Sequence, residues 1–315
     1  MRDLSITTNI GCRNMCSYCP QSTIISAYKN KCKDDSTLMS VETFKKCLDK
    51  LPEDVAISFA GLSEPFLNPN CTEMIQYSVE KGFKVSIFTT SIGMTKEDIK
   101  IIETLPLVRF EFHLPDDTSK TNIKIDENFL NILKLIKESK IQNIHYQVFG
   151  KPHPKVQEVL DFEVEDLSRI IQTRAGNVKG SKPRKLKGRI VCGCNGKELA
   201  GNNLLPNGDI YICTQDYGLK HKFGNLLEDS YEDLFKSEGF KEIQLGFEDS
   251  SKDILCRRCD LAIEVDSKRN RFKEFMRKIG IIDFLYSFNK IPIIQKGYIW
   301  YMNKIRRKKR FEEVR

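Results

Sequence analysis

The chain has 315 residues, of which 40% are hydrophobic and 30% charged, a composition typical of folded proteins and not of disordered ones. The net charge of +8 is unevenly placed, because residues 266–315 contain 15 Lys and Arg against 5 Asp and Glu. No run of about 18 apolar residues occurs, which argues against a spanning helix. Eleven cysteines without a signal-peptide pattern indicate reduced thiols, metal ligation and a cytoplasmic location.

Short apolar runs alternate with amphipathic segments from residue 3 to about 173, which predicts repeated βα units with parallel strands. We expect strands at residues 4–10, 55–60, 83–89, 107–114 and 143–149, and a less distinct sixth at 168–173. Helix starts are indicated by Ser40, by Thr95 with Asp98, by Asp126 and by Asn68-Pro69. Six units cannot close an eight-stranded barrel. The expected fold is therefore α/β, a partial (β/α)6 TIM-like barrel over residues 1–175.

Three cysteines follow the first expected strand within eight residues, at Cys12, Cys16 and Cys19. Thiolates hold the irons of [4Fe-4S] clusters, and three ligands leave one of the four irons open. The alternative is a structural zinc knuckle, which needs four ligands. Cys32 is then the nearest candidate for the fourth.

The spacing Cys-x3-Cys-x2-Cys, with Tyr18 before the third cysteine, resembles the signature of the radical S-adenosylmethionine (SAM) enzymes. The resemblance implies that the open iron chelates SAM, with Tyr18 helping to position it. It also implies that an electron, from a donor such as flavodoxin or ferredoxin, cleaves SAM to a 5′-deoxyadenosyl radical that abstracts hydrogen from substrate. The partial barrel matches the core fold of that family.

Sites in such barrels gather at the carboxyl ends of strands. Gly61, Ser63, Glu64 and Pro65, after the second strand, resemble the family's glycine-rich SAM motif, with Ser63 where a second glycine commonly stands. Thr89, Thr90 and Ser91, after the third, stand where the family often has Thr-Asn-Gly against the SAM ribose. The alternative for the first segment is a plain loop into a proline-started helix.

Two further residues are candidates at the barrel mouth. His113 follows the fourth strand and could contact SAM or substrate, or serve only in packing. Arg174 stands where the sixth strand would end, a region that faces substrate in the resembled enzymes. It is a candidate catalytic residue that binds or orients substrate, although a solvated linker arginine fits equally well. Cys47 lies on a helical apolar stripe and is expected in the core.

A second cysteine set follows a basic, glycine-containing linker at residues 176–190. Within residues 191–263, two short strands flank the turn Pro206-Asn207-Gly208, and a helix is expected around 231–236. The order resembles the SPASM/Twitch module, which implies one auxiliary [4Fe-4S] cluster. The expected ligands are Cys192, Cys213, Cys256 and Cys259, with Cys194 as the alternative to Cys192. Four thiolates also suit zinc.

Residues 264–315 form a basic, aromatic-bearing tail that is expected to be mainly helical. It could dock on the protein's own body, or bind an anionic membrane surface at the inner face or a partner protein. Nucleic acid is the less favoured partner.

The expected function is oxidation or rearrangement of a small polar, sugar-like molecule, with the auxiliary cluster as electron acceptor. Some resembled enzymes modify peptides, but no separate peptide-recognition module precedes the barrel. A different alternative is a non-catalytic zinc or iron-sulfur protein that binds membrane or RNA through its tail.

Overall fold

Nine strands form one continuous sheet in the computed structural model of the chain, which describes residues 2–32, 36–166, 173–194 and 201–265. Six of them, β1 to β6, pair in parallel and in chain order. The bounds are β1 Arg2–Ile6, β2 Val55–Phe59, β3 Val85–Thr89, β4 Arg109–His113, β5 Ile144–Val148, β6 Glu165–Asp166, β8 Asn202–Leu204, β9 Asp209–Tyr211 and β10 Lys222–Asn225. The predicted partial barrel is confirmed.

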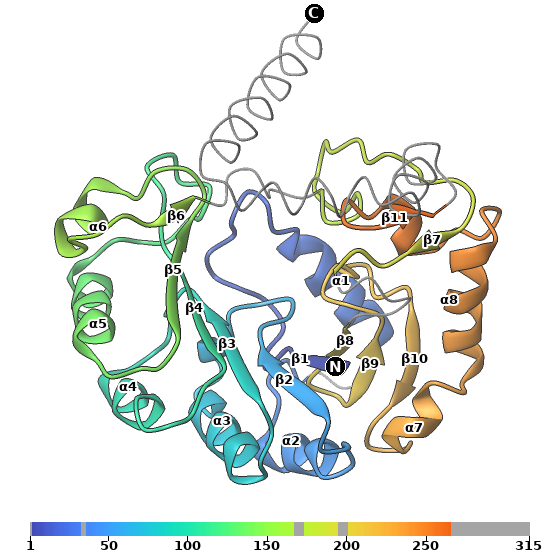
Figure 1. The fold of residues 1–315 in the computed structure, drawn as a ribbon, viewed down its shortest axis with the longest axis horizontal. Coiled ribbons are helices and arrows are strands. Elements are labelled where there is room, and N and C mark those ends of the chain that lie inside the picture. The colour runs from blue at the N-terminus through green and yellow to red at the C-terminus, as the bar shows by residue number, and fades with distance from the viewer. Residues whose placement is uncertain (1, 33–35, 167–172, 195–200, 266–315) are drawn as a thin grey trace, which may run out of the picture. The chain divides into compact units, whose positions relative to one another are not determined.

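Helices cover the outer side of the curved sheet, as Figure 1 shows for α2 to α5. Their bounds are α1 Gln21–Lys31, α2 Val41–Leu48, α3 Cys71–Glu80, α4 Lys96–Ile102, α5 Glu127–Glu138, α6 Pro154–Val159, α7 Tyr231–Leu234 and α8 Glu238–Glu248, with 3-10 turns η1 Pro65–Leu67 and η3 Leu255–Arg258. Three predicted caps are confirmed: Ser40 accepts from the Thr43 amide, Asp126 from the Phe129 amide, and Thr95 with Asp98 forms a capping box. Local side-chain chemistry therefore fixes where these helices begin.

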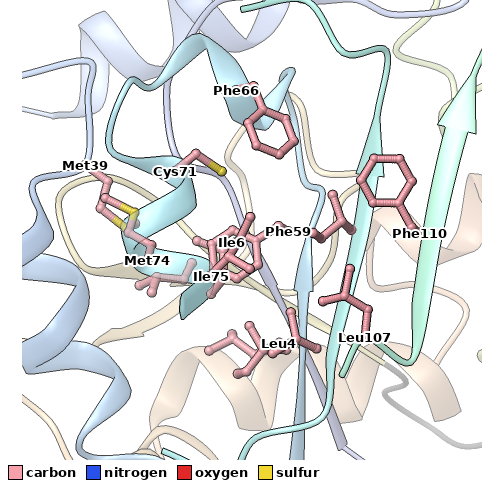
Figure 2. Packing of buried hydrophobic residues seen from close by; sticks show 14 of the residues in the cluster. Leu4, Ile6, Met39, Phe59, Phe66, Cys71, Met74, Ile75, Leu107 and Phe110 are labelled. Atoms are coloured by element: carbon pink, nitrogen blue, oxygen red, sulfur yellow. The ribbon is translucent and has the colours of Figure 1, made fainter. Parts of the chain in front are cut away.

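The core lies between the strands and the helices. Strand β3 alternates buried Val85, Ile87 and Thr89 with the less buried Ser86 and Phe88, as a strand with two different faces requires. Figure 2 shows how side chains of β1, β2 and α3 pack together in this layer. Cys47 is fully buried in the same cluster, so its predicted core position is confirmed.

The predicted helix start at Asn68-Pro69 is wrong. Helix α3 begins at Cys71 with Asn70 as its N-cap residue. The Asn68 side chain is used just before the helix: its nitrogen donates to the carbonyls of Thr8, at 2.9 Å, and Met39, at 2.8 Å, and its oxygen accepts from the Asn70 amide at 3.0 Å. A buried side chain with these partners ties the segment before α3 to the end of β1.

The cysteine-rich part of the chain extends the barrel sheet. Strand β8 pairs in parallel with β1, with Leu4 opposite Asn202 and Ile6 opposite Leu204, and β9 and β10 follow in antiparallel order. The predicted hairpin around Pro206-Asn207-Gly208 is thereby confirmed. Because β8 joins β1, residues about 200 positions apart lie side by side next to the three-cysteine loop.

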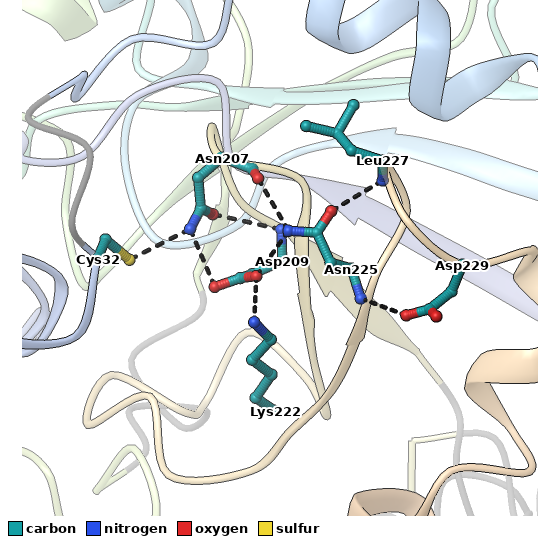
Figure 3. A network of polar contacts seen from close by, with 7 residues as sticks. All are labelled: Cys32, Asn207, Asp209, Lys222, Asn225, Leu227 and Asp229. Carbon is teal, nitrogen blue, oxygen red and sulfur yellow. Dashed lines mark hydrogen bonds and ion pairs between the residues drawn. The ribbon is translucent and has the colours of Figure 1, made fainter.

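Side-chain amides hold the hairpin turn in place (Figure 3). The Asn225 nitrogen donates to the Asn207 carbonyl at 3.1 Å and to the Asp209 carboxylate at 2.9 Å. Asn207 in turn donates to the sulfur of Cys32, at the end of α1, at 3.3 Å. This network links the cysteine-rich part to the helix that follows the three-cysteine loop.

Residues 1–263 form one compact unit, and 264–315 form a second that lies almost wholly outside the described residues. The basic tail and most of the sixth strand expected at 168–173 lie outside them as well. A short pair, β7 Ile190–Val191 and β11 Ile263–Glu264, closes the cysteine-rich part. The domain boundaries expected from the sequence remain predictions. Among the helices in the described residues, none has the length and apolar character needed to span a membrane.

Candidate functional site

A cavity of about 170 Å³ lies at the carboxyl ends of the barrel strands and brings together most of the predicted site residues. It is lined by the three-cysteine loop, by the segments that follow β2 and β5, by the ends of β3 and β4, and by two residues from beyond these strands. The lining residues are Cys12, Asn14, Cys16, Tyr18, Cys19, Gln21, Ala60, Gly61, Leu62, Ser63, Glu64, Phe88, Thr89, Thr90, His113, Phe149, Arg174 and Tyr217.

The three-cysteine loop is held from outside by the segment after β4. The Ser17 amide donates to the Lys120 carbonyl at 3.0 Å, and the Tyr18 hydroxyl lies 3.1 Å from Thr121 Oγ1. The Tyr18 ring also packs on Phe149, with 4.4 Å between centroids. Burial raises the pKa of Cys12 to about 11, so in the free protein this thiol is protonated, and metal binding must release the proton.

Gly61 allows the turn after β2 to sit directly on the end of β1. Its φ of +89° is a left-handed conformation, and a Cβ there would collide with the Thr7 side chain. The Leu62 amide then donates to Thr7 Oγ1 at 3.1 Å, and Ser63 Oγ donates to the Asn9 carbonyl at 2.6 Å. The close approach that requires glycine is therefore made to the side chain of Thr7, just past the end of β1.

The Glu64 carboxylate joins the ends of β2 and β3. It is 5% exposed and accepts hydrogen bonds from the amides of Phe66 and Thr90 and from the hydroxyls of Thr89 and Thr90. Burial is the main cause that raises its pKa, and these hydrogen bonds oppose the rise. Pro65 follows as the first residue of η1. Because Glu64 accepts from four donors, three of them on Thr89 and Thr90, its main role in this structure is to position the loop after β3.

The segment after β3 is divided between two cavities. Thr90 faces the cysteine cavity and accepts from Asn14, whose amide nitrogen lies 3.0 Å from Thr90 Oγ1. Ser91 instead lines a neighbouring cavity of about 640 Å³, of which Asn14 is also a wall. Ser91 is 3% exposed, and its hydroxyl has no hydrogen-bond partner among the residues that the structure describes. A buried hydroxyl without a partner is available to a ligand.

His113 and Arg174 meet at the same cavity. The His113 ring stacks on Phe149, with centroids 6.5 Å apart and an interplanar angle of 11°. Burial, and then the positive charges of Arg174 and Arg109, lower the pKa of His113 to about 4. The imidazole is therefore neutral near pH 7. The backbone of Arg174 is in the left-handed conformation, with φ of +52°.

Several lining residues were not predicted from the sequence, among them Asn14, Gln21 and Tyr217. Gln21 accepts from the Cys12 amide at 2.9 Å, and its nitrogen donates to the Leu62 carbonyl at 2.7 Å. Asn14 and Gln21 could have been proposed from their places within and just after the cysteine motif. Tyr217 carries no local signal, since only the pairing of β8 with β1 brings its region to the loop.

A second cavity, of about 200 Å³, is lined by all five cysteines of the second set: Cys192, Cys194, Cys213, Cys256 and Cys259. Within the described residues, no three His, Cys, Asp or Glu side chains are arranged to hold a single metal ion. The five thiols line one shared space, as the thiolate ligands of an iron-sulfur cluster must.

The cysteines of this cavity differ in their packing. Cys256 belongs to the apolar core, and Cys192, Cys213 and Cys259 pack against it, whereas Cys194 is exposed. Gly193 stands between Cys192 and Cys194, and a Cβ there would collide with the Leu261 carbonyl. A glycine is thus needed to bring the first cysteines next to the segment that carries Cys259.

Comparison with solved structures shows the same fold in proteins of low sequence identity. BtrN in complex with AdoMet and 2-DOIA is 17% identical, with a TM-score of 0.57 over 82% of this chain and 92% of BtrN. The structure of anSMEcpe with bound AdoMet is 14% identical, with a TM-score of 0.51 over 92% of this chain and 100% of anSMEcpe. Streptococcus suis SuiB bound to precursor peptide SuiA is 15% identical, with a TM-score of 0.54 over 82% of this chain and 69% of SuiB.

Two family matches agree with this likeness. Residues 6–163 match the Radical SAM superfamily, and residues 194–260 match SPASM, an iron-sulfur cluster-binding domain. No curated protein sequence matches the chain. The chain belongs to the radical SAM superfamily, as an enzyme with a SAM-binding [4Fe-4S] cluster and a SPASM domain that carries an auxiliary iron-sulfur cluster.

Proposed function

We propose that Cys12, Cys16 and Cys19 hold the catalytic cluster, and that the segments 61–65 and 89–91 hold SAM over its open iron. The donor set fits, since three thiols share one cavity with polar strand-end groups. When bound, the cluster and SAM supply the radical that abstracts hydrogen from substrate. The chain's own residues orient the cofactor and shield it: Tyr18 is fixed by Thr121 and Phe149, and Glu64 fixes Thr90.

We further propose Cys192, Cys213, Cys256 and Cys259 as the four ligands of the auxiliary cluster. Their shared packing against the apolar core supports this choice over Cys194. Four thiolates leave no iron open, so such a cluster suits electron transfer. It would accept the electron that a substrate radical loses on oxidation.

The proposed substrate is a small polar molecule that is oxidised or rearranged. The observation that supports it is Arg174, a guanidinium beside the neutral His113 at the wall of the catalytic cavity. Guanidinium offers five N–H donors in a fixed geometry, which suits hydroxyl, carboxylate or phosphate groups. BtrN, whose structure contains the small molecule 2-DOIA beside AdoMet, shares the fold.

A peptide substrate is the second candidate. The structure of anSMEcpe with AdoMet and the Cp18Cys peptide matches 92% of this chain, and SuiB is bound to a precursor peptide. A non-catalytic protein that binds membrane or RNA through its tail is set aside, because the chain is a member of an enzyme superfamily.

The first experiment is reductive SAM cleavage. Anaerobically reconstituted protein with dithionite and SAM should release 5′-deoxyadenosine, and Cys16→Ala should not. Cys32→Ala is the matched control, because Cys32 is another partly buried thiol close in sequence that lines neither cysteine cavity. Equal product from Cys16→Ala and Cys32→Ala would refute the ligand assignment.

The second experiment addresses the substrate. Deuterated candidates, small polyols and short peptides, are incubated with the enzyme, and deuterium in 5′-deoxyadenosine identifies the molecule that gave up hydrogen. With the true substrate, Arg174→Gln should raise KM about tenfold or more, the cost of a charged hydrogen bond, and leave SAM cleavage without substrate unchanged. An unchanged KM would remove Arg174 from the substrate site.

A further inference from the structure

The sulfur of Cys19 receives two hydrogen-bond partners from the chain. Gln21 Nε2 lies 3.0 Å from it, and the Tyr217 hydroxyl lies 3.2 Å from it. Gln21 belongs to the first turn of α1, two residues past Cys19 in sequence. Tyr217 belongs to the SPASM domain, four residues past Cys213. The cysteine-rich part of the chain therefore contacts a proposed ligand of the catalytic cluster.

The orientation of the Gln21 amide is set by its other partners. The side chain is 1% exposed, its oxygen accepts from the Cys12 amide, and one nitrogen hydrogen goes to the Leu62 carbonyl. A flipped amide would face the Cys12 N–H with its own NH2 and the Leu62 carbonyl with its oxygen. The second N–H is thus directed at Cys19.

Tyr217 is equally constrained. It is 2% exposed and packs in an apolar cluster with Ile24, Leu62 and Tyr211. Its loop is built around the fully buried carboxylate of Asp216, which accepts from the amides of Lys220, at 3.0 Å, and His221, at 2.8 Å. A thiolate sulfur can only accept, so in the cluster-bound protein the hydroxyl of Tyr217 is the donor.

We propose that Tyr217 and Gln21 raise the reduction potential of the SAM-binding cluster through their hydrogen bonds to the Cys19 sulfur. The proposal rests on the proposed function, in which Cys19 is a ligand of that cluster. Reduction adds one electron from an external low-potential donor, and no proton needs to move. The added negative charge strengthens hydrogen bonds to the ligand sulfur, so the donors favour the reduced form. Tyr217 is a positioning residue that lets the SPASM domain adjust the catalytic cluster.

The test is a potentiometric titration of the reconstituted holoenzyme, followed by electron paramagnetic resonance. The catalytic cluster is identified as the signal that changes when SAM is added. In Tyr217→Phe its midpoint potential should become more negative, so that the reduced-to-oxidised ratio at fixed potential falls about threefold to tenfold. Tenfold is about 59 mV for a one-electron couple. Gln21→Leu should shift the potential in the same direction.

Tyr211→Phe is the matched control. Tyr211 is also 2% exposed and lies in the same apolar cluster, but it does not line the catalytic cavity. Its midpoint should equal that of the wild type, with equal iron content in all variants. A wild-type midpoint in Tyr217→Phe, or an equal shift in Tyr211→Phe, overturns the proposal while SAM cleavage stands. Absence of any SAM-sensitive signal in the wild type would instead refute the proposed function.

Discussion

The two cysteine-lined cavities differ mainly in how many thiols they offer. In the proposed catalytic cavity three thiols share the wall with Glu64, Thr90 and Arg174. In the proposed auxiliary cavity five thiols share it with apolar side chains such as Phe247 and with polar ones such as Gln215. Three thiols leave one iron of a [4Fe-4S] cluster open to an organic ligand, whereas four thiolates leave none open, which suits electron transfer. The number of thiols, more than the polarity of the wall, therefore separates the two proposed roles.

The largest effect that separates the two cavities is expected from Cys256→Ala. Cys256 is a buried member of the core, so its loss should remove about four irons per chain and leave the catalytic cluster in place. Cys194→Ala should retain all the iron, because Cys194 is exposed. Iron and sulfide analysis of anaerobic protein measures both. Loss of iron from Cys194→Ala, with retention in Cys192→Ala, would reverse the assignment of the first ligand.

Gly61→Ala should destabilise the catalytic side by about 3 kcal/mol, because it combines a positive φ with a collision against Thr7. Gly82→Ala is the control, since Gly82 also has a positive φ, of +83°, but a Cβ there meets open space. Its cost should be about 1 kcal/mol. Anaerobic thermal unfolding compares the two variants. Equal shifts in melting temperature would show that crowding against Thr7 contributes nothing.

Sequence reasoning succeeded where the signal is local. The cysteine spacing, the alternating strands and the caps at Ser40, Thr95 and Asp126 each depend on residues within a few positions of one another, and the structure places them as expected. Cys12, Cys16 and Cys19 could likewise be grouped because one loop carries all three. Their meeting with residues 61–64 followed from the rule that parallel strands end at one edge.

Sequence reasoning failed where the hydrogen-bond partner of a side chain lies far away in the sequence. Asn68 resembles a helix start, but its side-chain nitrogen donates to the carbonyls of Thr8 and Met39, which lie 60 and 29 residues earlier in the chain. Tyr217 could not be assigned, because its contact with Cys19 depends on β8 lying beside β1. Neither outcome has a local pattern, since each results from packing between segments far apart in the chain.

A pH effect of intermediate size should come from His113 on the catalytic side. Its pKa of about 4 lies below the ordinary 6.5, so between these values the unfolded chain binds the extra proton and the folded one does not. Stability should therefore fall as the pH drops from about 6.5 to 4, by about 1 to 3 kcal/mol. Urea unfolding of cluster-free protein avoids acid loss of the clusters. His113→Gln should lose this part of the pH dependence; an unchanged profile would show that His113 titrates normally.

Ser91→Ala is expected to have the smallest effect on stability. It also tests directly whether SAM reaches the neighbouring cavity that Ser91 lines. The Ser91 hydroxyl is buried and has no partner within the described part of the chain, so its removal should change the free energy of unfolding by no more than about 0.5 kcal/mol. If it binds SAM, the Kd for SAM should rise about fivefold to tenfold, the value of one hydrogen bond. Thr89→Val is the contrast, because Thr89 donates to Glu64 and accepts from the Ser91 amide, and its loss should destabilise the protein itself. Equilibrium dialysis with SAM measures the Kd of both. An unchanged Kd in Ser91→Ala would restrict SAM to the cavity of the three cysteines, where Thr90 and Glu64 already lie.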